Sequence, residues 1–233
     1  MILAIMTRVW LLAVFVVALS ILPFLSQAVS VREILSEKWS SAPRFYSQLF
    51  GEYAAFFLGV FFSFLLFGVM GGMDFVSLFV GFRVPPLDVL KGIPFFDFVG
   101  SLLLNNIGVF LLAFLLSLLI ELGVSLVVSW NAVFWGLLMA MRIFQVGLAS
   151  DSPFSAIFFM LVILPHLILE AVAYIAAAYA GLLLSRLVIR EKELRWGAEE
   201  IISQGTKLLI IGLLLLVCAS LLEGIVFLYV IPT

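Results

Sequence analysis

His166, the one histidine in the chain, lies four residues before Glu170 within a long apolar run. Residues four apart share a helical face, so an imidazole and a carboxylate would point the same way. Such a pair can relay protons, because an imidazole titrates near neutral pH. It can also supply two metal ligands, which are too few for a zinc site without partners. The leading interpretation is a hydrogen-bonded helix clamp, which would also satisfy carbonyl groups freed by Pro165.

Other polar side chains interrupt the apolar runs, and each would be energetically costly at membrane depth. These residues are Asn105, Asn106, Glu121, Asn131, Arg142, Gln145 and Glu223. Depths counted from the rise of a helix predict that the polar network forms two layers. One layer contains Arg142 and Glu223 as a buried pair, with Asn105 and Asn106 as candidate members. The other layer contains Asn131, His166 and Glu170.

Catalytic signatures are missing from the sequence. It contains no His-Glu-x-x-His zinc motif and no Gly-x-x-x-x-Gly-Lys phosphate loop. Thiol or Ser–His–Asp chemistry would have to use His166, and the single cysteine, Cys218, lies inside an apolar run. We therefore expect no enzymatic activity, no metal site and no cofactor. An intramembrane enzyme that uses His166 and Glu170 is the weaker alternative.

The elements that position these residues must be membrane helices. Of the 233 residues, 65% are hydrophobic and 11% are charged, with a mean hydropathy of +1.32. Soluble domains are about 45–50% apolar and about 25% charged. Transmembrane β-strands alternate polar and apolar residues, whereas the apolar runs here are continuous. The predicted fold class is an all-α polytopic integral membrane bundle with about six transmembrane helices. The net charge of −2 indicates no nucleic-acid partner.

Apolar runs long enough to cross a bilayer divide the chain, which forms a single membrane domain. Each crossing needs about 20 mostly apolar residues. The predicted spans are 9–25, 54–72, 99–121, 127–147, 155–184 and 207–230. The third and fourth spans are joined by a few residues and must form an antiparallel hairpin. The segment 31–52 mixes charged and aromatic residues, which is typical of an interfacial helix or turn and equally of an aromatic-belted loop.

Basic residues are distributed unevenly between the two sides of this arrangement. The side formed by segments 27–53 and 185–206 holds Arg32, Lys38, Arg44, Arg186, Arg190, Lys192, Arg195 and Lys207. The other side holds Arg8, Arg83, Lys91 and Arg142. The positive-inside rule therefore predicts that the first side is cytoplasmic, with both termini outside a cell membrane. The first span also resembles a secretory signal, but cleavage would place segment 185–206 outside, so we expect an uncleaved span.

Small and polar residues recur at helical spacing on three spans. Ala173, Ala177 and Gly181 continue the face of His166 and Glu170 as a strip that allows helices to approach closely. The other two stripes are Asn106, Phe110, Ala113, Ser117 and Glu121, and Asn131, Trp135, Leu138, Arg142 and Gln145. The three stripes imply one shared interior surrounded by lipid-facing apolar residues. Gly59 and Ser63 offer a second close-packing site, either within the bundle or between protomers of a homo-oligomer.

The order and spacing of the polar motifs resemble the stage II sporulation protein M family. The matching motifs are Leu104-Asn105-Asn106, Asn131, Leu164-Pro165-His166-x-x-x-Glu170 and Leu222-Glu223-Gly224. The resemblance covers roughly residues 99–230. Ala132 and Leu167 stand where the family has glycine, which puts tight-turn or close-packing roles there in doubt. The family is named for a membrane component that works with peptidoglycan-degrading partners during forespore engulfment, and it has no established enzymatic activity.

The resemblance and the missing catalytic motifs together favour a non-catalytic membrane protein. The leading hypothesis is a scaffold or subunit of a membrane- or envelope-remodelling complex. Its expected partners are the lipid bilayer and other membrane or envelope proteins. The alternative is a transporter or channel with a polar pathway lined by Asn105, Asn106, Asn131, His166 and Glu170.

Overall fold

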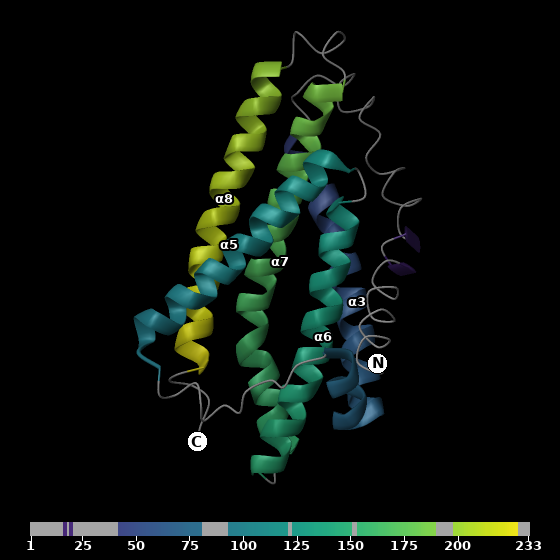
Figure 1. The fold of residues 1–233 in the computed structure, drawn as a ribbon, viewed down its shortest axis with the longest axis vertical. Helices are drawn as coiled ribbons and strands as arrows, with labels where there is room; N and C mark the ends of the chain where they lie inside the picture. Colours follow the sequence, from purple (N-terminus) through teal and green to yellow (C-terminus); the bar gives the residue numbers. More distant parts are fainter. Residues whose placement is uncertain are drawn as a thin grey trace.

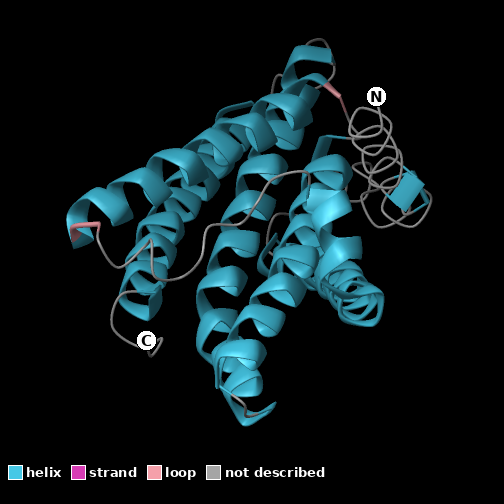
Figure 2. Ribbon diagram, turned by 60° about the horizontal axis from the view of Figure 1, so that its bottom comes forward, coloured by secondary structure: helices cyan, strands magenta, loops and turns pink. Residues whose placement is uncertain are grey.

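The computed structural model describes residues 16–17, 19–20, 42–80, 93–120, 123–150, 153–189 and 198–227. Across these residues every regular element is a helix (Figure 2). The long helices are α3 (Ala42–Val80), α5 (Phe95–Leu119), α6 (Gly123–Ser150), α7 (Pro153–Ile189) and α8 (Ala198–Ile225) (Figure 1). The described part of the chain is therefore an all-helical bundle, as predicted.

Each of these five helices contains a stretch long and apolar enough to cross a membrane. The stretches are Phe50–Gly72, Phe95–Leu119, Gly123–Gln145, Ile157–Ser185 and Ala198–Ile225. They overlap the last five predicted spans, although α8 begins nine residues before the predicted start at 207. Glu199 and Glu200 lie in the first turn of α8, where carboxylates interact favourably with the helix dipole. This helix therefore extends past its apolar run.

Some sequence predictions fall wholly or partly outside the described residues. The predicted first span, 9–25, is described only at residues 16–17 and 19–20. Residues 31–41 of the predicted interfacial segment and Glu121 also lie outside the described ranges. The remainder of that segment, from Ala42 onward, continues directly into α3.

The path of α3 changes direction at Gly72. This residue has φ 77° and ψ 178°, a backbone conformation that glycine adopts without the steric cost borne by other residues. The apolar stretch Phe50–Gly72 ends at the same point. The helical residues after Gly72 follow a new direction, so the membrane-crossing part of α3 is the part before it.

The helix α7 occupies the centre of the bundle. It packs against α5, α6 and α8 and also touches α3, whereas α3 packs chiefly against α6 (Figure 1). Successive helices run in opposite directions, and α5 crosses the bundle obliquely (Figure 1). Small residues form the middle of α7, where Ala173 and Ala176 to Ala178 are almost completely buried. Small side chains let the surrounding helices approach one axis closely.

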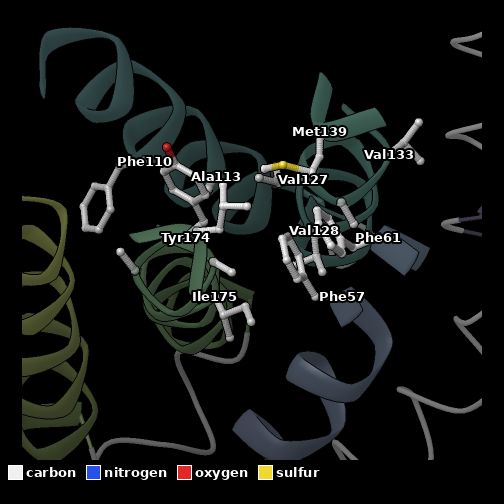
Figure 3. Packing of buried hydrophobic residues seen from close by; sticks show 14 of the residues in the cluster. Phe57, Phe61, Phe110, Ala113, Val127, Val128, Val133, Met139, Tyr174 and Ile175 are labelled. Atoms are coloured by element: carbon white, nitrogen blue, oxygen red, sulfur yellow. The ribbon is translucent and has the colours of Figure 1, made fainter. Parts of the chain in front are cut away.

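Aromatic and aliphatic side chains fill the space between the helices. Figure 3 shows Phe57 and Phe61 of α3 beside Val128 of α6, and Phe110 of α5 beside Tyr174 of α7. These residues belong to one buried cluster that spans all five helices. The outward faces carry large apolar residues, among them Met70, Phe96, Leu104, Leu119 and Phe154. Such an outer surface suits contact with acyl chains, as expected for a membrane bundle.

Candidate functional site

Three helices bring polar side chains together in the bundle interior. Asn106 of α5, Glu170 of α7 and Ser220 of α8 are 4%, 1% and 0% exposed. The Nδ2 atom of Asn106 donates a hydrogen bond to Glu170 Oε1 at 2.5 Å, and it lies 3.5 Å from Ser220 Oγ, which accepts a second, longer bond. Asn106 therefore links three helices through side chains that lie far apart in sequence. We call these residues, together with Glu223, the polar centre.

Asn105 orients the amide group of Asn106. Asn105 Nδ2 donates to Asn106 Oδ1 at 3.3 Å. Because the Oδ1 atom of Asn106 accepts from Asn105, the NH2 group of Asn106 is turned toward Glu170 Oε1. The exposed Asn105 therefore holds the buried Asn106 in the orientation in which its NH2 group reaches Glu170.

Glu223 adds a second buried carboxyl group to the polar centre. It lies three residues after Ser220 on α8 and is 6% exposed. The carboxyl group of Glu223 interacts electrostatically with that of Glu170 and with the guanidinium group of Arg142 on α6. The side chains of four helices thus contribute to one electrostatic unit.

Arg142 is held by further contacts besides this attraction. Its Nη1 atom donates to Gln145 Oε1 at 2.8 Å. Its guanidinium carbon lies 5.8 Å from the centre of the Phe227 ring, a distance typical of a cation–π contact. These contacts fix a buried positive charge on α6 at the edge of the polar centre.

His166 packs in a direction different from that of Glu170. Its ring lies edge-to-face against Trp135 of α6, with centroids 6.0 Å apart and an interplanar angle of 76°. Neither ring nitrogen has a hydrogen-bond partner among the described residues. The predicted hydrogen-bonded clamp between His166 and Glu170 is therefore wrong. The two side chains share a face of α7, but Glu170 turns toward α5 and α8 while His166 packs against α6.

The predicted division into two polar layers is also wrong. Asn106 was expected apart from Glu170, yet the two are hydrogen-bonded. Asn131 was expected beside Glu170, but its Nδ2 donates to Val127 O of its own helix at 2.9 Å. Depths counted along the chain assumed helices of similar tilt whose spans begin in one plane. The oblique course of α5 and the length of α7 make that assumption fail (Figure 1).

The predicted packing residues on α7 are buried against neighbouring helices. Ala173 and Ala177 are 0% exposed, and a side chain at Gly181 would collide with the Phe114 carbonyl oxygen of α5. By contrast, Gly59 and Ser63 are exposed, and Gly59 has no atom within 4 Å of the place a Cβ would occupy. These two residues therefore do not bring α3 close to another described helix.

Sequence reasoning missed Ser220 and Gly212, which lie on the inner face of α8. A serine or glycine within an apolar run carries little energetic cost, so neither attracted notice. A Cβ at Gly212 would lie 2.6 Å from the Phe110 ring and 3.2 Å from Ala173 O. The spacing of Ser220 three residues before Glu223 was the available signal, since residues three apart share a helical face.

The described ranges contain no group of three or more His, Cys, Asp and Glu residues that could hold a metal ion. Zinc sites in proteins are usually built from three or four such ligands. The polar centre instead offers carboxyl and hydroxyl oxygens, because the amide oxygen of Asn106 accepts from Asn105. Its chemistry suits the exchange or binding of a hard, positively charged species.

A helical bundle with long apolar outer faces and a buried polar centre defines this chain as an integral membrane protein. Residues 53–226 match the family model of stage II sporulation protein M, so the chain belongs to that family. The match begins within α3, well before residue 99, where the motif resemblance began. Comparison with curated proteins and with solved structures found no match.

The two departures from the family's glycine pattern lie inside helices. Ala132 of α6 is 0% exposed and Leu167 of α7 is 2% exposed. Neither residue lies in a turn, so no tight-turn role exists at these positions in this chain. Both side chains are accommodated within the packed interior.

Proposed function

We propose that this chain is a non-catalytic membrane subunit that organises other membrane or envelope proteins. The observation that supports this most strongly is the pair of hydrogen bonds that the Asn106 amide donates. Its amide joins Glu170 and Ser220 and so ties α5, α7 and α8 to one another. Here the polar residues of the family motifs serve to fix the relative positions of helices. A frame with fixed helices can present constant surfaces to partner proteins.

Close backbone packing supports the same role. A Cβ at Gly136 of α6 would lie 2.6 Å from Phe61 O of α3, and Gly181 of α7 lies directly against the backbone of α5. Helices in such contact cannot slide or separate without losing van der Waals contacts over their length. This packing favours a static frame over a bundle whose helices rearrange.

Capture from native membranes tests the proposal. The tagged full chain, expressed at its normal level, is crosslinked in the membrane, solubilised in mild detergent and purified, and the captured proteins are quantified by mass spectrometry. We expect a small set of envelope proteins at constant ratio to the chain. The Asn106→Ala variant should retain less of them, whereas Asn105→Ala should retain nearly all. Recovery of no protein at a constant ratio would contradict the proposal.

Transport is the second candidate function, and the pairing of two buried carboxyl groups favours it. Glu170 and Glu223 interact electrostatically within the bundle, and intramembrane carboxyl groups are common in proton and ion pathways. The purified chain in sealed vesicles provides the test, with proton or Na⁺ flux as the readout. Flux lost in Glu170→Gln but kept in Glu200→Gln would overturn the scaffold proposal, because Glu200 is an exposed carboxyl group at the start of α8.

A further inference from the structure

The polar centre contains more carboxyl groups than cationic side chains. Within the described residues, Glu170 of α7 and Glu223 of α8 are the carboxyl groups of this centre, and Arg142 of α6 supplies a positive charge near Glu223. The α5 side chains there, Asn105 and Asn106, are neutral amides. Tyr174, which lies near both carboxyl groups, is neutral as a phenol. With both carboxyl groups ionised, one negative charge remains uncompensated, which is costly in a membrane interior.

One oxygen of Glu170 is also left without a partner. Its Oε1 atom accepts from Asn106, but its Oε2 atom is buried and has no hydrogen-bond partner among the described residues. Buried polar atoms are almost always satisfied by protein, ordered water or an ion. Ser220 Oγ lies on the same inner surface, within reach of the Asn106 amide. The centre therefore presents an unpartnered carboxyl oxygen of α7 beside a hydroxyl oxygen of α8.

We propose that Glu170, Ser220 and Glu223 bind one small monovalent cation, Na⁺, between α7 and α8. Carboxylate and hydroxyl oxygens are ligands that hard cations prefer. When both carboxyl groups are ionised, Arg142 compensates one of them and a single positive charge compensates the other, so a monovalent ion matches the centre better than a divalent ion. The bound ion would hold together two helices that otherwise bring like charges into contact. This site does not depend on the scaffold proposal, since it follows from the interior of the chain alone.

Sodium binding to the purified full chain tests the site. Equilibrium dialysis with radioactive Na⁺, with choline as the replacement cation, should give one bound ion per chain. Thermal unfolding in detergent should shift upward by about 3 °C when about 150 mM NaCl replaces choline chloride. Glu170→Gln and Glu223→Gln should each abolish the binding and the shift, and the exposed Glu200→Gln should retain both.

A milder variant covers the case in which loss of a carboxyl group prevents folding. Ser220→Ala keeps both carboxyl groups and removes one oxygen ligand, so it should weaken Na⁺ binding several-fold. In size-exclusion chromatography the variant should elute at the volume of the wild-type chain, which shows that it folds. The absence of Na⁺ binding in the wild-type chain would overturn the site. Stabilisation by lower pH with no response to Na⁺ would also overturn it, because a proton would then neutralise the pair. Either result would leave the capture experiment unaffected.

Discussion

At the residue scale, the environment of Glu170 depends on a single amide. Among the residues that the structure describes, Asn106 Nδ2 is the hydrogen-bond donor to this carboxyl group, which is 1% exposed. Removing one partner of a buried hydrogen bond costs more than the bond itself contributes, because the remaining group stays desolvated. The neighbouring Asn105 contributes less, since its side chain is exposed and bonds only indirectly to the centre through Asn106.

Replacing Asn106 by alanine should therefore destabilise the bundle by about 1–2 kcal/mol. Thermal or denaturant unfolding of the detergent-purified chain, followed by circular dichroism, measures the change. Asn105→Ala is the matched control, because it removes the same functional group one position away and should cost less than about 0.5 kcal/mol. If the two variants lose equal free energy of unfolding, the hydrogen bond from the Asn106 amide to Glu170 contributes no more to stability than the Asn105 side chain does.

At the scale of the helices, glycine determines how closely some pairs approach. Gly181 allows α7 to reach the backbone of α5, and Gly212 admits the Phe110 ring and lies near the Ala173 carbonyl. Helix association in lipid relies on such van der Waals contact because acyl chains are as apolar as the side chains they replace. Not every small residue has this role, as the exposed Gly59 demonstrates.

The substitution Gly181→Ala should force α5 and α7 apart and cost about 1–3 kcal/mol. The expected sign is a lower Tm in mild detergent. Gly59→Ala serves as the control, because its new methyl group meets no neighbouring atom within 4 Å and alanine favours a helix more than glycine does. Its Tm should stay unchanged or rise slightly. If both substitutions lower the Tm equally, α5 and α7 do not pack as closely as described.

At the scale of the whole molecule, the alternating helices assign the described loops and helix ends to two sides. The beginnings of α3, α6 and α8 lie at one end of the bundle and the beginnings of α5 and α7 at the other (Figure 1). The sequence analysis assigned most basic residues outside the apolar spans to the side of segments 27–53 and 185–206, which is the end where α3, α6 and α8 begin. We propose that this end faces the cytoplasm, following the positive-inside rule.

Cysteine labelling tests this orientation. In a Cys218→Ser background, Glu199→Cys at the start of α8 should react with a membrane-impermeant maleimide only after the membrane is opened. Asp97→Cys in the first turn of α5 should react in intact cells, since the carboxylate there is exposed and α5 begins at the other end of the bundle. The reverse pattern would place the basic end outside.

The sequence by itself determined the class of the protein and most of its helices. Continuous apolar runs of bilayer length leave the backbone no alternative to helices in lipid, because each amide must be paired within its own segment. Helical spacing also identified which faces turn inward, since Asn106, Phe110, Ala113 and Ser117 are all buried. Both properties are local, so composition and periodicity were sufficient to predict them.

Only the tertiary structure decided which inward-facing residues meet. Helix tilt and the distance of each helix end from the membrane are set by packing against neighbours, and neither is encoded in the spacing along one helix. For that reason Glu170 was wrongly paired with His166, although its hydrogen bond comes from Asn106 of α5. The position of Ser220 in the polar centre likewise depends on how α8 packs against α5 and α7, which the spacing along α8 does not encode.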